Sequence, residues 1–301
     1  MMLIAGTFPD GNLPLTVGEV RTEDGHLVIQ GRRLPCMQGS GAMMSAAVAV
    51  AEYLKLDPPQ AVVAGDIGQG QGSRAIYEHL IQNVNALAPE VLALHYWLPD
   101  MELTRKLCEA VDRCDRRPVM VADAASMYSA KATGLAPSFD IFTPDATEMA
   151  FLADPDATHP AYIARHLFDT DITRTPRLVE TAYANNSAAT LLLVKGAVDY
   201  VVRSGEIVDT IDEPDVPALE AIGGTGDTIT GLVSAFVYAG LEAHEAAAIA
   251  ARANRMAGQF AGATPAHRIS DIIDQFPAVF REYLCQWSGV CCTGTEGEHD
   301  D

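Results

Sequence analysis

The chain has 301 residues, of which 49% are hydrophobic, and a formal net charge of −20 at pH 7. This length and composition suffice for a large buried core. The negative charge disfavours nucleic acids and anionic membrane surfaces as partners. No stretch approaches the roughly 20 apolar residues of a membrane span, and the first residues, MMLIAGTFPD, lack the basic region of a signal peptide. We therefore expect a cytoplasmic protein whose partners include neither a nucleic acid nor a membrane.

Short apolar runs alternate with segments of helical periodicity in the first half of the chain. The clearest buried-strand candidates are bounded by Gly, Pro or Asp: AVVAG (61–65), VLALHYW (91–97), PVMVAD (118–123) and FDIFTP (139–144). Helices are expected between and after them, over residues 73–87, 101–114, 146–153 and 160–168. This alternation predicts a three-layer α/β sandwich in which a mostly parallel central sheet is covered by helices on both faces.

From residue 189 onward the sequence is typical of strands joined by short turns. Three strand-like runs are separated by glycine-containing turns: ATLLLVKG (189–196), DYVVRSG (199–205) and EIVDTID (206–212). They predict an antiparallel meander at one edge of the sheet. An Ala-rich helix is expected over about 242–261.

The two ends of the chain are less regular. Residues 1–35 include the hairpin-like TVGEVRTEDGHLVIQGRR (16–33), for which we expect an edge hairpin or an arm. Residues 1–285 are predicted to form a single α/β domain, followed by a disordered acidic tail over 286–301. The six cysteines include no CxxC pair, so free thiols are expected rather than disulfides or metal sites.

One segment combines glycines, an acid and a helix. AIGGTGDTITGLVSAFVYAG (221–240) places three glycines and one aspartate in six positions, before an apolar pattern typical of a helix. The first N–H groups of a helix have no intrahelical partner and carry partial positive charge, so residues 223–226 are predicted to cradle a phosphate. Asp227 either complements the helix dipole or acts as a general base beside that phosphate.

A second glycine-rich stretch follows a predicted strand. GDIGQGQGS (65–73) is G-x-G-x-G rather than the dinucleotide-binding G-x-G-x-x-G, and no strand-ending acid follows about 20 residues on. The chain also lacks the G-x-x-x-x-G-K-[ST] phosphate motif. Because the stretch lies where open α/β sheets bind ligands, contact with a ligand and a plain tight turn are both open.

GGTGDTITG resembles the glycine-rich signature of the ribokinase superfamily. Further segments occur in the order and spacing of one branch, the ADP- or ATP-dependent NAD(P)H-hydrate dehydratases: FTPDATEMAFL (142–152), LLLVKGAVDYVV (191–202), AIGGTGDTITGLVSAFVYAGL (221–241) and ISDIIDQFP (269–277). The resemblance covers roughly residues 36–284. It implies a ribokinase-like fold, binding of ATP or ADP with Mg²⁺, repair of hydrated nicotinamide nucleotides and, because this branch often oligomerises, a homo-oligomer.

The resemblance assigns roles to residues at and near the glycine loop. Asp227 becomes the catalytic acid–base residue. The residues implied in nucleotide binding are Lys195, Gly196, Ala197 and Asp199, with the first three on the adenosine side, and Gly224, Thr225 and Gly226 in the loop, where Gly226 lies beneath the phosphates. Without the resemblance, Lys195 would be interpreted as a solvated lysine at the end of a strand.

Other residues are implied on the metal and substrate side. Asp145 and Glu148 resemble the N-x-x-E element, in which Glu148 would organise Mg²⁺ through water, and hard oxygen ligands suit that ion. The alternative interpretation is two acids that favour a helix N-terminus. The candidate substrate contacts are Gly39, Ser40, Gly41, Ala46, Gly68, Asp123 and Asp145, although the small residues near position 40 would equally permit close helix packing.

Four departures from the branch surround the expected ligands. Asp145 stands where the dehydratases have the histidine of T-P-H-P-G-E, and Asp199 replaces the threonine of K-G-x-x-T. The D-A-D-x-L-N element keeps only its first acid, Asp123, and G-P-G-L-G has no unambiguous counterpart. The nucleotide chemistry is therefore expected to be intact, while the identity of the second substrate is open.

Three functions fit these residues. In the first, a nucleotide phosphate activates a ring hydroxyl for elimination and Asp227 assists proton transfer, giving NADH or NADPH. In the second, the machinery stops after phosphoryl transfer, as in a kinase for a sugar, a hydroxymethylpyrimidine or a thiazole alcohol. The third is a nucleotide sensor without catalysis, against which the retained Asp227 argues.

A predicted strand ends in His95, Tyr96 and Trp97. These residues either line the acceptor pocket or only pack against other buried residues.

Overall fold

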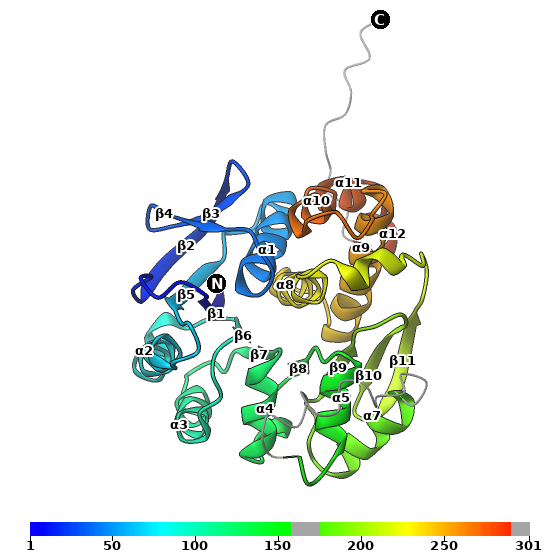
Figure 1. Ribbon diagram of the computed structural model, residues 1–301. Helices are drawn as coiled ribbons and strands as arrows, with labels where there is room; N and C mark the ends of the chain where they lie inside the picture. The colour runs from blue at the N-terminus through cyan, green and yellow to red at the C-terminus, as the bar shows by residue number, and fades with distance from the viewer. Residues whose placement is uncertain (158–174, 290–301) are drawn as a thin grey trace, which may run out of the picture.

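The computed structural model describes residues 1–157 and 175–289 (Figure 1). The helix expected over 160–168 and the part of the expected tail over 290–301 lie outside these residues. Within the described ranges, none of the helices combines the length and the hydropathy that a membrane crossing requires.

One mixed sheet runs through the centre of the molecule. In the described residues it has 11 strands in the order β11-β10-β9-β8-β7-β6-β1-β5-β2-β3-β4. Its inner strands are parallel: β5 (Gln60–Gly65), β1 (Met2–Phe8), β6 (Val91–His95), β7 (Val119–Ala122), β8 (Ile141–Phe142) and β9 (Leu191–Val194). They are mostly buried on both faces, as apolar strands of a covered parallel sheet should be.

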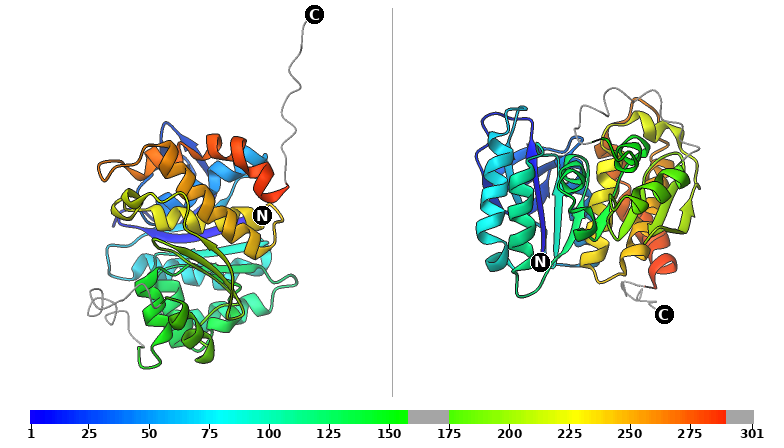
Figure 2. Two further views of the ribbon diagram at one scale, coloured as in Figure 1. Left: turned by 90° about the vertical axis from the view of Figure 1, so that its right-hand side faces the viewer. Right: turned by 90° about the horizontal axis from the view of Figure 1, so that it is seen from below.

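Helices cover both faces of the sheet (Figures 1 and 2). Alternate residues of a strand face opposite cores, so Ile4 packs in one core and Leu3 in the other. The first core contains α1 (Ser40–Leu54), α8 (Thr225–Tyr238), α9 (Ala243–Phe260), α10 (Ile269–Ile273) and α11 (Phe276–Val279). The second contains α2 (Gln71–Leu87), α3 (Met101–Asp112), α4 (Ala125–Ala132), α5 (Ala146–Ala153) and α7 (Thr175–Ala184). The predicted three-layer α/β sandwich is confirmed.

Antiparallel strands extend both ends of the sheet. At one end β9 continues into the expected meander of β10 (Asp199–Arg203) and β11 (Glu206–Ile211). At the other end lie β2 (Thr16–Glu23), β3 (His26–Ile29) and β4 (Arg32–Pro35). Residues 1–35, expected to be an edge hairpin or an arm, also supply the central strand β1, whose apolar run lacks the polar alternation that marks an edge strand.

The C-terminal part differs from expectation in two respects. Cys285–Ser288 form α12, so the first residues of the expected tail are helical. Cys285 is also disulfide-bonded, whereas Cys36, Cys108 and Cys114 are free thiols. The expectation of free thiols is therefore wrong for Cys285, because the spacing of cysteines along a chain does not report which of them approach each other in space.

Helices α1 and α8 are in backbone contact. A Cβ at Gly231 of α8 would lie 2.1 Å from the carbonyl oxygen of Met43 and 3.2 Å from the Cβ of Ala46, both in α1. Glycine is therefore required for this approach. Ala46, an expected substrate contact, is fully buried in this helix interface.

Candidate active site

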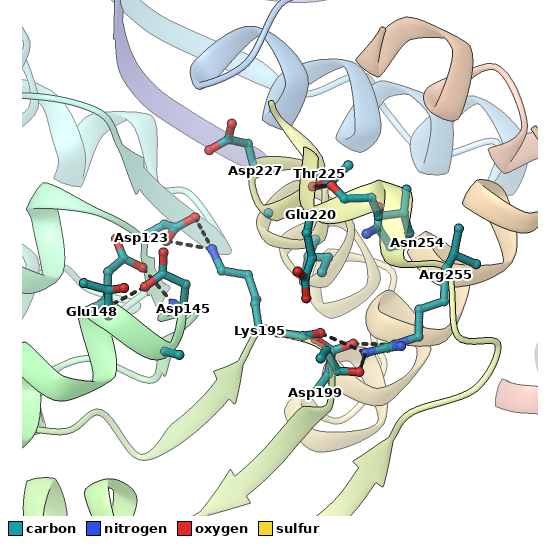
Figure 3. A pocket seen from close by; sticks show the side chains of 18 of the residues that line it. Asp123, Asp145, Glu148, Lys195, Asp199, Glu220, Thr225, Asp227, Asn254 and Arg255 are labelled. Carbon is teal, nitrogen blue, oxygen red and sulfur yellow. Dashed lines mark hydrogen bonds and ion pairs between the residues drawn. The ribbon is translucent and has the colours of Figure 1, made fainter. Parts of the chain in front are cut away.

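A cavity of about 580 Å³ lies at the carboxyl ends of the strands from β6 to β9, beside the start of α8 (Figure 3). This is the edge at which parallel α/β sheets bind ligands. The cavity brings together residues of the turn at 195–199, of the glycine loop and of the expected metal and substrate side. They are Asp123, Asp145, Glu148, Lys195, Gly196, Ala197, Asp199, Thr225, Gly226 and Asp227.

The residues that begin α1 lie behind this lining. Gly39 reaches the site through its N–H group, which donates to Asp227. Ser40 and Gly41 are buried, and a Cβ at Gly41 would lie 2.7 Å from the carbonyl oxygen of Pro35. Ser40 and Gly41, expected to contact the substrate, are therefore covered by packing and are not among the residues that line this cavity.

Two other glycines expected at ligands have packing or turn roles. Gly224 has φ 109°, and a Cβ there would lie 2.9 Å from the Ile269 side chain, so this glycine lets the loop pack on α10 rather than face the cavity. Gly68 is exposed with φ 90° and lies outside the lining. Its N–H donates to Oδ1 of Asp66 at 3.0 Å, which favours the tight-turn interpretation of residues 65–73.

The first turn of α8 presents main-chain N–H groups beside the cavity. Thr225 begins the helix, and the N–H groups of Gly226 and Asp227 belong to the first turn, which has no intrahelical acceptors. A Cβ at Gly226 would lie 3.5 Å from Nζ of Lys195. The ammonium group of Lys195 thus lies beside the glycine loop.

Asp227 presents an ionised carboxylate to the cavity. Its Oδ1 lies 2.9 Å from Nε2 of His95 and its Oδ2 accepts the N–H of Gly39 at 2.5 Å, while 15% of the side chain is exposed. Burial raises the pKa of Asp227, but the contacts with His95 and Gly39 outweigh burial and bring the pKa below its ordinary value. A fixed carboxylate of this kind is suited to accept a proton from a bound hydroxyl.

Replacing Gly39 with alanine is expected to lower turnover about tenfold to a hundredfold, because a charge-assisted hydrogen bond to Asp227 would be lost. Gly39 has φ 81°, which L side chains rarely adopt, so the substitution displaces its N–H. Gly25→Ala is the matched control, since Gly25 has φ 71° and open space around it on the β2–β3 turn. Both variants should lose about 1–3 kcal/mol of stability to strain. Equal turnover in the two would contradict the role of Gly39.

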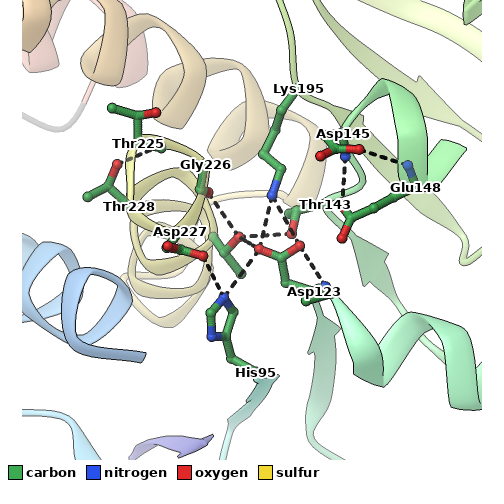
Figure 4. A network of polar contacts seen from close by, with 12 residues as sticks. His95, Asp123, Thr143, Asp145, Glu148, Lys195, Thr225, Gly226, Asp227 and Thr228 are labelled. Carbon is green, nitrogen blue, oxygen red and sulfur yellow. Dashed lines mark hydrogen bonds and ion pairs between the residues drawn. The ribbon is translucent and has the colours of Figure 1, made fainter. Parts of the chain in front are cut away.

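Asp123 anchors a buried polar network beneath the cavity (Figure 4). Its oxygens accept from Nζ of Lys195 at 3.0 and 3.1 Å, from Oγ1 of Thr230 at 2.6 Å and from the N–H of Ala124 at 2.8 Å. Only 2% of Asp123 is exposed. Asp123 lines the cavity, where a substrate contact was expected, and its carboxylate also orients Lys195.

Asp145 and Glu148 form a capping box at the start of α5. Oδ1 of Asp145 accepts the N–H of Glu148 at 2.7 Å, and Oε2 of Glu148 accepts the N–H of Asp145 at 2.8 Å. The hydroxyl of Tyr128 donates to Oε1 of Glu148 at 2.9 Å. Burial, followed by the charges of Asp145 and Asp123, raises the pKa of Glu148 to about 8. This geometry is that of the alternative interpretation, in which the two acids stabilise a helix N-terminus. Both acids also line the cavity.

Arg255 of α9 closes the far wall of the cavity. Its Nε donates to Oδ2 of Asp199 at 2.7 Å, and both groups are buried. Its remaining donors bind the carbonyl oxygens of Gly196, Ala197, Asp212 and Pro214. Asp199, expected to contact the nucleotide, lines the cavity, holds Arg255 and accepts the N–H of Gly196 at 2.9 Å. All donors of the guanidinium therefore have acceptors, and Arg255 fixes the turn after β9.

Sequence reasoning missed several lining residues or left their role open. Tyr96 lines the cavity, has φ 53° and is half exposed, and a Cβ at Gly39 would lie 3.7 Å from its ring. His95 is buried against Asp227. Arg255 was missed, because α9 holds two arginines, Arg252 and Arg255, and the sequence does not show that Arg255 is the buried one.

The cavity carries an excess of negative charge. Seven acidic and two basic residues line it, and the two basic residues, Lys195 and Arg255, are already paired with Asp123 and Asp199. A polyanionic ligand such as a nucleotide would therefore meet net repulsion unless a cation accompanied it.

Comparisons of family and sequence agree with the resemblance. A family model described as NAD(P)H-hydrate dehydratase matches residues 86–275. The chain is 34% identical over 242 residues to uncharacterized protein MJ1337 from Methanocaldococcus jannaschii, a match that covers 80% of this chain and 100% of that protein. It is 41% identical over 95 residues to the bifunctional NAD(P)H-hydrate repair enzyme Nnr from Pyrobaculum aerophilum, but this match covers 31% of the chain and only 18% of the repair enzyme.

Solved structures share the fold. The ADP/ATP-dependent NAD(P)H-hydrate dehydratase from Bacillus subtilis, co-crystallized with ATP/Mg²⁺, has a TM-score of 0.54 at 13% identity and covers 93% of this chain and 90% of its own. Pyridoxal kinase from Entamoeba histolytica has a TM-score of 0.52 at 13% identity, with 92% and 94% covered. These likenesses show the fold alone, which is the predicted ribokinase-like fold. Since the family model spans more than half of the chain, the protein belongs to the NAD(P)H-hydrate dehydratase family of enzymes.

Proposed function

We propose that this enzyme uses ATP or ADP to dehydrate hydrated NADH or NADPH. The observation that carries the proposal is the ionised carboxylate of Asp227 at a cavity that also borders the first-turn amides of α8. Family membership supplies the reaction class. The cytoplasmic location and the homo-oligomer stay predictions from the sequence.

The residues of the cavity fit a magnesium ion. Lys195 and Arg255 are already paired, so the phosphates of a nucleotide need an added cation. Carboxylate oxygens are ligands that Mg²⁺ accepts, usually together with water and phosphate. Asp145 and Glu148 line the cavity, and Glu148 would hold the ion through water. When bound, the ion offsets phosphate charge.

The chain's own residues account for the proton and the developing charge. Asp227 would accept the proton of the substrate's ring hydroxyl as its oxygen attacks the terminal phosphorus of the nucleotide. The N–H groups of Gly226 and Asp227 would stabilise the transferring phosphoryl group. The transfer breaks the bond between the terminal phosphorus and the rest of the nucleotide, which leaves with one phosphate fewer. The resulting phosphate ester is a better leaving group than the hydroxyl, so it departs as inorganic phosphate, the neighbouring ring carbon loses a proton to solvent, and the reduced nicotinamide forms.

A small-molecule kinase is the second candidate. Asp145 lines the cavity where the dehydratases have a histidine that helps to hold the hydrated nucleotide, and this difference favours another acceptor alcohol. The same residues would perform phosphoryl transfer, and elimination would not follow.

Incubation of the full chain with hydrated NADH or NADPH, MgCl₂ and either ATP or ADP tests the proposal. We expect the absorbance of reduced nicotinamide to appear only when nucleotide and metal are both present. The parallel reaction replaces the hydrate with a panel of sugars and heterocyclic alcohols and measures ADP release from ATP. Turnover with an alcohol but not with a hydrate would replace the dehydratase with the kinase.

A further inference from the structure

His95 lies between two carboxylates at the end of β6 (Figure 4). Its Nε2 is 2.9 Å from Oδ1 of Asp227 and 3.6 Å from Oδ2 of Asp123, and its side chain has no exposed surface. The first distance is that of a hydrogen bond, whereas the second is too long for one. Nε2 of His95 therefore donates its proton to Asp227, the carboxylate that borders the cavity.

Of the two carboxylates near His95, Asp123 is already paired with a cation and Asp227, in the part of the chain that the structure describes, is not. Lys195, behind Asp123, binds both oxygens of that carboxylate at 3.0 and 3.1 Å, so Asp123 already has a cation. Asp227 has no ammonium or guanidinium partner among the described residues, and Tyr96, whose ring lies 4.8 Å from that of His95, is neutral. Burial lowers the pKa of His95, but the two carboxylates outweigh burial and raise the pKa to about 9. At 2.9 Å from Oδ1 of Asp227, a protonated His95 would balance the charge of that carboxylate.

The same three side chains are poorly arranged for a metal ion. Single ligand atoms of His95, Asp123 and Asp227 lie within 4.8 Å of one another. However, Nε2 of His95 is hydrogen-bonded to Asp227, and the ammonium of Lys195 occupies both oxygens of Asp123. A divalent cation would meet that ammonium at close range. The geometry favours an ion pair instead.

We propose that His95 is a positioning residue for Asp227, with which it forms a buried ion pair that fixes the carboxylate at the cavity and keeps it ionised. The inference rests on the proposed function, because it concerns how Asp227 is prepared for that reaction. His95 holds Oδ1 and the N–H of Gly39 holds Oδ2, so both oxygens of Asp227 are fixed from opposite elements, β6 and α1. The acid is thereby available as a base without first losing a proton.

The substitution His95→Gln keeps an N–H donor and removes the charge. We expect kcat at pH 7 to fall about tenfold to a hundredfold, with the KM for nucleotide unchanged, since His95 is not among the residues that line the cavity. The acid limb of the kcat/KM profile should move to higher pH by about one unit, because the uncompensated carboxylate of Asp227 takes up a proton more readily. His26→Gln, on the exposed β2–β3 hairpin, should change neither quantity. A folded H95Q protein with an unmoved acid limb would refute the proposal.

A second measurement does not depend on activity or on the folding of H95Q. In ¹⁵N-histidine NMR of the wild-type protein, one buried histidine should remain an imidazolium above pH 8, and Asp227→Asn should shift its titration to lower pH. A His95 that is neutral at pH 7 would overturn the ion pair. If the wild-type protein shows the expected titration but turns over neither hydrate nor alcohol, the ion pair stands and the proposed function fails.

Discussion

Asp227→Asn is expected to lower turnover by about 10² to 10⁴ while nucleotide affinity changes little. The amide has nearly the size of the carboxylate and its oxygen still accepts a hydrogen bond, so the first turn of α8 should keep its shape. An amide cannot accept the proton of a substrate hydroxyl, and the chemical step therefore loses its base. Steady-state kinetics with the hydrate, together with calorimetric titration of ATP in the presence of MgCl₂, separate the two effects.

The control for this variant is Asp112→Asn at the end of α3, where the side chain is 65% exposed. It makes the same chemical change outside the cavity and should leave turnover intact. Full turnover by Asp227→Asn with normal nucleotide binding would contradict both the dehydratase and the kinase mechanisms, because both need this residue to take the proton.

Arg255→Met is expected to destabilise the protein by about 3–5 kcal/mol, the usual cost of removing one partner from a buried ion pair. Asp199 would be left buried without its cation, and the carbonyl oxygens that Arg255 binds would lose their donor. Chemical denaturation at pH 8 measures the loss. Arg252→Met is a matched control on the same helix, since the Arg252–Asp209 pair is about one-third exposed and should contribute only about 0–1 kcal/mol.

The loss in Arg255→Met should depend on pH with a known sign. Burial already raises the pKa of Asp199, and the guanidinium opposes that rise. Without Arg255, the folded-state pKa of Asp199 rises further above its unfolded value, so the variant regains stability as pH falls through that folded-state pKa. We therefore expect a smaller loss at pH 5 than at pH 8. Adding Asp199→Asn should restore part of the stability at pH 8, and equal losses at both pH values would show that the Asp199 charge is not the cause.

The fold was predictable because apolar runs and helical periodicity in the sequence indicate which residues are buried in strands and helices. The helix predicted over 146–153 coincides with α5, and the predicted meander coincides with β9 to β11. Strand β1 was missed because it begins at the second residue, where no turn signal precedes it. Helix α4 was also missed, since ASMYSAKA has little apolar periodicity.

The candidate site was predictable to the level of segments, while the partners of individual side chains were not. The glycine loop, the turn after β9 and the start of α5 do meet at one cavity. Whether an acid faces a ligand or a buried cation depends on residues far away in the chain, such as Arg255 for Asp199 and Lys195 for Asp123. Local spacing carries no information about such pairs, so their roles needed the structure.

The backbone contact between α1 and α8 has a consequence for how the cavity works. The N–H of Gly39 and the carboxylate of Asp227 start from these two helices, which Gly231 allows to touch. Dipoles that are held in place before a reaction need no reorientation during it, and electrostatic catalysis depends on that stiffness. This wall should therefore be preset, and selectivity between acceptor molecules should arise on the opposite wall, from the loops that follow β8 and β9.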